Sequence, residues 1–245
     1  MTAFSRILVK KGRLEIGLKV SKAEGSGLFF LSRGLSTAVL RQSGKTSETD
    51  NSYVILHPAM PMSLTAFTLC MSLASELPTN REIILFSYYN SGDALNLWVE
   101  NGKFNLYLLQ SSPVSFSLPQ LSTFSTNLCV TWESSSGMTT FWVNGKSSVR
   151  KVNRQGYKVQ NGGIVILGQD QDSLGNTFDI KQSFAGEITN VHLWDYVLSS
   201  DEICLVSEGH TVPKGNVIDW NSVDYESGVL YIFTNIKVIK KQANI

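Results

Sequence analysis

Short segments in which apolar and polar residues alternate recur along most of the chain, and this is the pattern of half-buried β-strands. The segments richest in β-branched and aromatic residues are 52–56, 66–71, 95–100, 103–109, 127–133, 139–143, 146–150, 163–167, 188–194 and 228–233. Asn101-Gly102 and Asn144-Gly145 each separate two such segments. An Asn-Gly pair supplies the positive φ angles of a type I′ turn, so the sequence predicts two hairpins here.

A single short helix is predicted near residue 200. Ser199 or Ser200 provides an N-cap, acids follow at 201 and 202, and Gly209 ends the apolar run. Many strands, one helix and no alternation of strands with helices predict an all-β fold, an antiparallel β-sandwich.

The composition allows one large β domain or two small ones. Of the 245 residues, 42% are hydrophobic and 17% are charged, which is enough apolar material for a sizeable core. The net charge of +1 creates no global field toward nucleic acid or an anionic membrane. No apolar run is long enough for a transmembrane helix. A charged ligand must therefore bind to a local cluster of charged or polar side chains.

The two ends of the chain are predicted to lie outside the main domain, 38–236. Residues 1–37 lack the order of a secretory signal, although 13–20 alternate like a strand. A pro-segment, an extra strand and a mis-called start all fit, and we favour the mis-called start. Residues 237–245 are basic, and we expect a solvated tail.

Catalytic motifs are hard to find in this sequence. The three histidines, at 57, 192 and 210, do not have the spacing of a zinc site. A nucleophile elbow, a Walker loop and a dinucleotide fingerprint are all missing from the sequence.

The densest group of acids and amides spans residues 169–182. Asp170 and Asp172 are two positions apart, so they point the same way in an extended segment, and Asp179 and Gln182 return across a turn at Gly175. Gathered carboxylates repel one another, and a calcium ion, which takes six to eight oxygen ligands, removes that repulsion. A polar surface loop fits this pattern too. A glycosidase acid pair would need a partner carboxylate across a cleft.

Seven segments, in order, resemble those of the pentraxin family. They are 50–54, 66–70, 127–134, 141–146, 165–173, 184–188 and 193–203. Asn127 stands where the family signature normally begins with histidine. The resemblance runs from about Ala38 to Thr234 and implies a jelly-roll, concanavalin-like sandwich. It also implies secretion, a role in innate immunity and the acute phase, and cyclic homo-oligomers, usually pentamers.

The resemblance further implies a disulfide and two adjacent calcium ions. The count of three cysteines allows one bridge and a spare thiol, and the family pairs Cys70 with Cys129, leaving Cys204 free. The implied ligands of one ion are Asp93, Asp170, the backbone carbonyl of Gln171, and Asp172. Those of the other are Asp170, Asp172, Asp179 and Gln182. Ala94 departs from the family, which usually has asparagine there as a ligand.

The implied ligands of the protein carry phosphate or acidic groups, as phosphocholine and phosphoethanolamine do. Val99 stands at the position of the apolar residue that, in the family, packs against the choline methyl groups. Pro113 stands near the position of the acid that, in the family, faces the quaternary nitrogen of choline. Tyr107 offers a cation–π face or simply packs across strands. Because no acid is evident near Pro113, we expect the two ligands to bind alike.

We therefore expect a calcium-dependent pattern-recognition protein, lectin-like and without enzyme activity. One alternative is a structural or adhesive oligomer with weakened ligand binding. Another is a jelly-roll glycoside hydrolase, which the missing acid pair disfavours.

Overall fold

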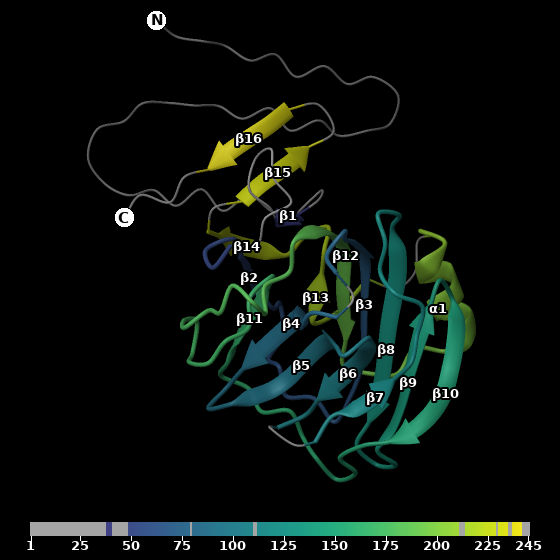
Figure 1. The fold of residues 1–245 in the computed structure, drawn as a ribbon. Coiled ribbons are helices and arrows are strands. Elements are labelled where there is room, and N and C mark those ends of the chain that lie inside the picture. Colours follow the sequence, from purple (N-terminus) through teal and green to yellow (C-terminus); the bar gives the residue numbers. More distant parts are fainter. Residues whose placement is uncertain are drawn as a thin grey trace, which may run out of the picture. The chain divides into compact units, whose positions relative to one another are not determined.

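Most of the strands predicted from alternation are present in the structure, which is a computed structural model (Figure 1). It describes residues 38–40, 49–78, 80–109, 112–210, 214–228, 230–234 and 237–241, with the backbone alone for 38–40 and from 230 onward. These residues belong to one compact unit, Leu31–Ile245. Residues 1–37, with the strand expected at 13–20, lie outside the described part. No described helix is long and apolar enough to cross a membrane.

The strands form two antiparallel sheets. Sheet A has the order β10-β9-β8-β3-β12-β1-β15-β16, with β13 paired to β12. Its strands are β1 Ala38–Leu40, β3 Ala66–Ala74, β8 Thr126–Glu133, β9 Met138–Val143, β10 Lys146–Val152, β12 Gly186–Trp194, β13 Ile218–Asp219, β15 Leu230–Thr234 and β16 Lys237–Lys241. Sheet B has the order β14-β2-β11-β4-β5-β6-β7. Its strands are β2 Val54–His57, β4 Ile83–Tyr89, β5 Asp93–Glu100, β6 Lys103–Tyr107, β7 Val114–Phe116, β11 Ile164–Leu167 and β14 Asp224–Ser227.

Both predicted hairpins are confirmed. β5 pairs with β6 through Asn101 and Gly102, whose φ angles are 49° and 69°. β9 pairs with β10 through Asn144 and Gly145, with φ angles of 49° and 76°. Positive φ at both turn positions is the geometry that Asn-Gly was expected to supply.

The core lies between the two sheets. Alternate residues of each strand point into it, as Leu69 and Met71 do on β3 and Leu97 and Val99 on β5. The residues between them point to the outer faces of the sandwich. The all-β antiparallel sandwich predicted from the sequence is confirmed, and it has the jelly-roll class of fold.

The outer face of sheet A carries the disulfide and the helix. Cys70 and Cys129 lie directly opposite each other on β3 and β8 and form the predicted bridge. The helix, α1 Ser200–Ser207, covers them, and Ile203 packs into their cluster. Ser199 is its N-cap, and Cys204 is a half-buried free thiol, as expected.

The predicted C-terminal tail contains a strand. Residues 237–241 pair with β15 as β16, so a strand lies within the segment for which a solvated tail was predicted. Val238 and Ile239 are β-branched and favour a strand, whereas the tail was predicted from its lysines alone.

Candidate functional site

The acidic loop lies over the outer face of sheet B, where it follows β11. Gln169, Asp170 and Gln171 are buried, with exposed fractions of 0%, 6% and 0%. Asp170 accepts a hydrogen bond of 3.1 Å from the amide of Asn96 on β5, which joins the loop to the strand that begins with Asp93. The fold therefore brings together two acids that are far apart in the sequence.

Three of the predicted ligands experience one another's charge. The pKa of Asp170 is raised to about 7, first by burial and then by Asp93 and Asp172. The pKa of Asp93 is raised by burial and by Asp172, against the lowering effect of a hydrogen bond with Asn96. Asp93, Asp170 and Asp172 thus form one electronegative cluster in which ionisation is unfavourable without a cation.

Gln171 has its side chain engaged with protein atoms. Its Nε2 donates to Ser87 Oγ at 3.1 Å and to the Ile164 carbonyl at 3.1 Å, and its Oε1 accepts from the Gly175 N–H at 3.0 Å. A cation at this position can therefore meet the backbone carbonyl of Gln171 but not its amide, which is the role that the family resemblance implies.

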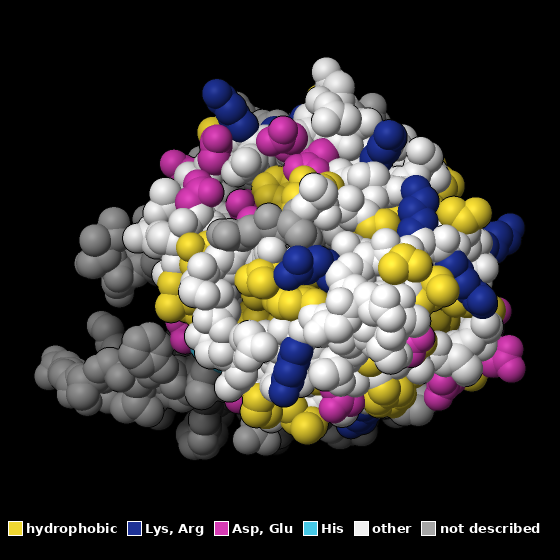
Figure 2. All heavy atoms as spheres, turned by 90° about the horizontal axis from the view of Figure 1, so that it is seen from below, with side chains coloured by type: hydrophobic (Ala, Val, Ile, Leu, Met, Phe, Trp, Pro, Cys, Tyr) yellow, Lys and Arg dark blue, Asp and Glu magenta, His cyan; other side chains and the backbone are white. Residues whose placement is uncertain are grey.

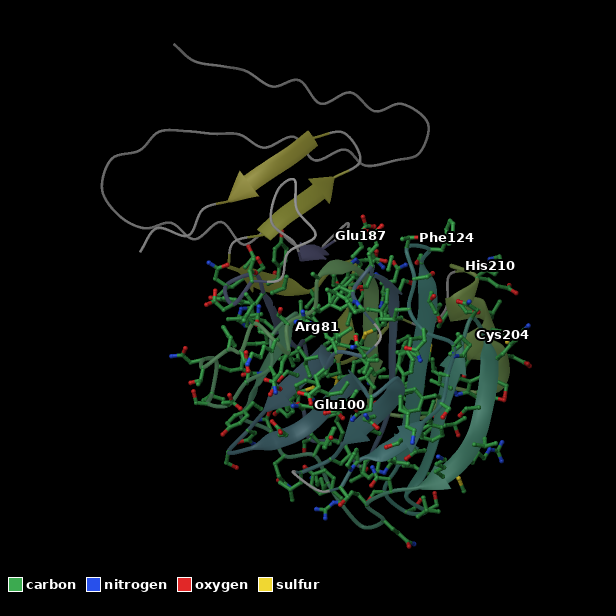
Figure 3. All side chains as sticks on the ribbon, in the orientation of Figure 1. Arg81, Glu100, Phe124, Glu187, Cys204 and His210 are labelled. Atoms are coloured by element: carbon green, nitrogen blue, oxygen red, sulfur yellow. A yellow bond between two sulfur atoms is a disulfide. The ribbon has the colours of Figure 1, made fainter. Side chains whose placement is uncertain are left out.

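The far end of the loop is a turn tied to β4. Asp179 Oδ1 accepts from the Lys181 N–H at 2.9 Å, and the carbonyl of Gln182 accepts from the Ile84 N–H at 3.0 Å. Arg81, labelled in Figure 3, donates to the carbonyls of Ile180 and Ser183 at 2.6 and 3.0 Å. Asp179 does not contribute to the pKa shifts of Asp93 and Asp170. The structure therefore joins the first three acids, but not Asp179, into one charge cluster.

The donor set suits a hard cation. Among the described residues, no three His, Cys, Asp or Glu side chains are grouped closely enough to hold a metal by themselves. Calcium also takes backbone carbonyl and amide oxygens, and all the atoms predicted to bind it here are oxygens. The buried carboxylate of Asp170, beside two like charges, fits such an ion. The two-calcium site stays a prediction.

The predicted apolar wall, Val99, lies in the core with 2% exposed, so it cannot line a surface pocket. The cause is a β-bulge: Tyr88 pairs with Leu95 and Tyr89 with Asp93, so Ala94 is an extra residue. Beyond it Val99 faces inward, whereas Trp98, outside the core cluster, faces outward beside Asn105 of β6.

Tyr107 lies on the outer face, directly opposite Asn96, and is half-buried. Its hydroxyl donates to Glu100 at 2.9 Å, and Asn105 donates to the same carboxylate at 2.7 Å. Burial and Glu100 raise the pKa of Tyr107. Glu100, labelled in Figure 3, is an acid on the same outer face as Tyr107, and sequence comparison missed it. The hairpin register could have revealed it, because Asn101-Gly102 places Glu100 and Tyr107 on one face.

Two antiparallel sheets form a β-sandwich that carries an acidic loop on one outer face. Residues 45–232 match the model described as the Pentaxin family. This chain belongs to the pentraxin family, as the resemblance indicated. C-reactive protein of Danio rerio is 52% identical over 183 residues, covering 73% of this chain and 81% of that protein. C-reactive protein of Homo sapiens is 37% identical over 182 residues, covering 73% and 80%.

A solved structure confirms the fold independently. The native heptameric serum amyloid P-like pentraxin of Limulus polyphemus aligns with a TM-score of 0.63 at 22% identity, covering 80% of this chain and 95% of that one. At this identity the likeness concerns the fold alone.

Proposed function

We propose that this protein is a secreted, calcium-dependent pattern-recognition protein that binds phosphate-bearing or acidic groups on the outer face of sheet B. The observation that carries the proposal is the cluster of Asp93, Asp170 and Asp172, with Asp170 buried beside two like charges. A carboxylate that is buried beside two like charges loses stability when it ionises unless a cation offsets the repulsion. Similarity to C-reactive proteins supports the same function.

The proposed site holds two calcium ions. Asp93, Asp170, Asp172 and the Gln171 carbonyl bind the first, and Asp170, Asp172, Asp179 and Gln182 bind the second. Four carboxylates balance the charge of two divalent ions. Ala94 offers no side-chain oxygen, so the first ion has room for ligand oxygens or water. Phosphate oxygens are hard donors suited to those positions.

The outer-face residues beyond the acids suit a cationic group. Tyr107 presents an aromatic ring, and the carboxylate of Glu100 is fixed beside it by two hydrogen bonds. Glu100 thus supplies the counter-charge that could not be found near Pro113. We still expect phosphocholine and phosphoethanolamine to bind alike, because both carry a cation. Glu100→Gln should weaken both ligands about equally and leave inorganic phosphate unaffected, with Glu226→Gln on β14 as a control.

The deciding experiment is a calorimetric calcium titration of the full chain, followed by titration of phosphocholine with and without EDTA. Calcium binding near two ions per chain, and ligand binding that EDTA abolishes, are expected. If the wild-type chain takes up no calcium, the proposed function is wrong.

Ala94 favours a second candidate, a structural or adhesive oligomer with weakened ligand binding. We propose a closed homo-oligomeric ring in either case, because a head-to-tail interface closes when its rotation divides the circle. A ring in analytical ultracentrifugation without calcium-dependent ligand binding would favour this candidate. Monomer alone at micromolar concentration would contradict the ring.

A further inference from the structure

Asn96 connects three parts of the molecule through one buried amide. It is 0% exposed and lies on the outer face of β5. Its Nδ2 donates to Asp170 Oδ1 at 3.1 Å, and Asp93 begins the same strand three positions earlier. Its Oδ1 accepts from the backbone N–H of Tyr88 at 3.1 Å. The amide therefore joins β4 to Asp170, the buried acid of the proposed site.

The orientation of this amide follows from its partners. The Tyr88 N–H can only donate, so the atom facing it must be the oxygen of Asn96. The amino group then faces the carboxylate of Asp170. The bulge at Ala94 explains why the Tyr88 N–H bonds to a side chain, because the ladder pairing shifts there. The amide is consequently fixed with its donors toward the acids.

Asp93 and Asp170 come from different elements and repel each other. A donor to Asp170 from the strand that Asp93 begins offsets part of that repulsion and holds the Asp170 carboxylate against the outer face of that strand. Ala94, two positions earlier, provides no polar side chain for this purpose.

We propose that Asn96 is a positioning residue for the calcium site: its amino group holds Asp170 against the strand that Asp93 begins before the metal arrives, and Asn96 does not itself bind the ion. This inference rests on the proposed function. To bind calcium directly, the amide would have to turn over and leave the buried Tyr88 N–H without an acceptor. The acids are therefore arranged in advance, which favours calcium binding without adding a ligand.

Two variants test the proposal. Asn96→Leu keeps the shape but removes both donors and the acceptor, and we expect calcium affinity to fall at least tenfold in calorimetry. Asn96→Asp keeps the acceptor for the Tyr88 N–H and removes the donors, so it remains informative if the leucine variant does not fold. Asn216→Leu is the matched control, because Asn216 makes the same pair of bonds with Asp195, at 2.7 Å to its carboxylate and 3.1 Å from its N–H.

Europium luminescence lifetimes in H₂O and D₂O separate positioning from direct binding. The number of waters on the bound ion should be the same in wild type and Asn96→Leu. One additional water in the variant would show that Asn96 is a ligand, and a calcium affinity within twofold of wild type would show that it does not position the site. Either result overturns the proposal.

Hydrogen exchange in EDTA distinguishes failure of this inference from failure of the proposed function. Without metal, residues 168–172 should exchange faster in Asn96→Asp than in wild type or in Asn216→Leu. Unchanged exchange would overturn the positioning role even if wild type binds calcium. Faster exchange in a protein that binds no calcium would show that Asn96 holds the acids and that the proposed metal function is wrong.

Discussion

The two outer faces of this sandwich are both covered, but by different chemistry. On sheet A, the Cys70–Cys129 bridge, Trp194, Leu198 and Ile203 form an apolar cluster under α1. On sheet B, the buried groups under the acidic loop are Asn96, Asp170 and Gln171, with Asp93 beside them.

The two faces differ in whether burial alone stabilises the groups that lie on them. An apolar cluster gains stability from burial itself, and a covalent bridge needs no partner. Buried like charges lose stability unless something offsets them. The face of sheet A is complete as folded, whereas the face of sheet B would gain stability from the proposed calcium ions. In Figure 2, several acidic side chains gather at the upper left of the face shown, while Lys and Arg side chains are spread among apolar ones.

The largest effect is expected on sheet A. Replacing Cys70 and Cys129 by alanine should lower the free energy of unfolding by about 4 kcal/mol, because the bridge restrains a long loop in the unfolded chain. Urea unfolding measures the loss, which should be equal with calcium and with EDTA. A loss that appears only in EDTA would show that the two faces are coupled. A peptide map linking Cys204 to either cysteine would contradict the pairing itself.

Calcium should act on sheet B alone. At free calcium of about a hundred times the dissociation constant, one site adds about 2.7 kcal/mol to stability. Asp172→Ala should remove more of this gain than Asp93→Ala, because Asp172 is proposed to bind both ions. Thermal unfolding and protease cleavage in 170–182 check the prediction. If EDTA changes neither, the proposed site is in the wrong place.

The calcium-free protein should lose stability as pH rises. Asp170 has a folded pKa of about 7 against an ordinary value of 3.8, so the folded state holds the proton more tightly. The contribution is present at low pH and is lost as pH passes through about 7, about 1.4 kcal/mol between pH 6 and pH 8. Unfolding in EDTA at both pH values measures it. Asp170→Asn should remove this loss, and saturating calcium should do the same. If Asp170→Asn loses as much unfolding free energy between pH 6 and pH 8 as the wild type does, groups other than Asp170 cause the pH dependence.

The smallest effect concerns the helix on sheet A. Ser199 accepts from the Glu202 N–H, and its own N–H donates to the Glu202 carboxylate at 2.8 Å. Ser199→Ala should therefore cost about 1 kcal/mol, independently of calcium. Ser200→Ala, one position inside the helix, should have little effect. Equal losses in the two variants would argue against the cap.

Local signals predicted much of the fold. Each Asn-Gly pair fixed a hairpin through backbone geometry, and the serine with a following acid fixed the start of α1. The strand β4 was not singled out, because Ile83–Tyr89 is mostly buried and lacks clear alternation. The disulfide came from family resemblance, since the cysteine count alone left the pairing open.

The site was predicted in part. The acidic loop was found because its residue types are unusual together, whereas Asp93 came from the family resemblance. The structure brings Asp93 near Asp170 and Asp172. Val99 was assigned by aligning the chain with the family, and the structure places it in the core. Asn96 carries no signal in the sequence, because its role depends on a contact with Asp170 that only the fold creates.

The bulge at Ala94 also determines which changes this face can tolerate. Because Ala94 is the extra residue, deleting it would leave Leu95 opposite Tyr88 and Asp93 opposite Tyr89 in a regular ladder, and the residues after it would keep their faces. Substitution at 98, 100 or 107 leaves that alternation intact. A deletion between Leu95 and Glu100 is different, because it would turn the residues on one side of it to the opposite face, and core and outer-face residues would exchange places.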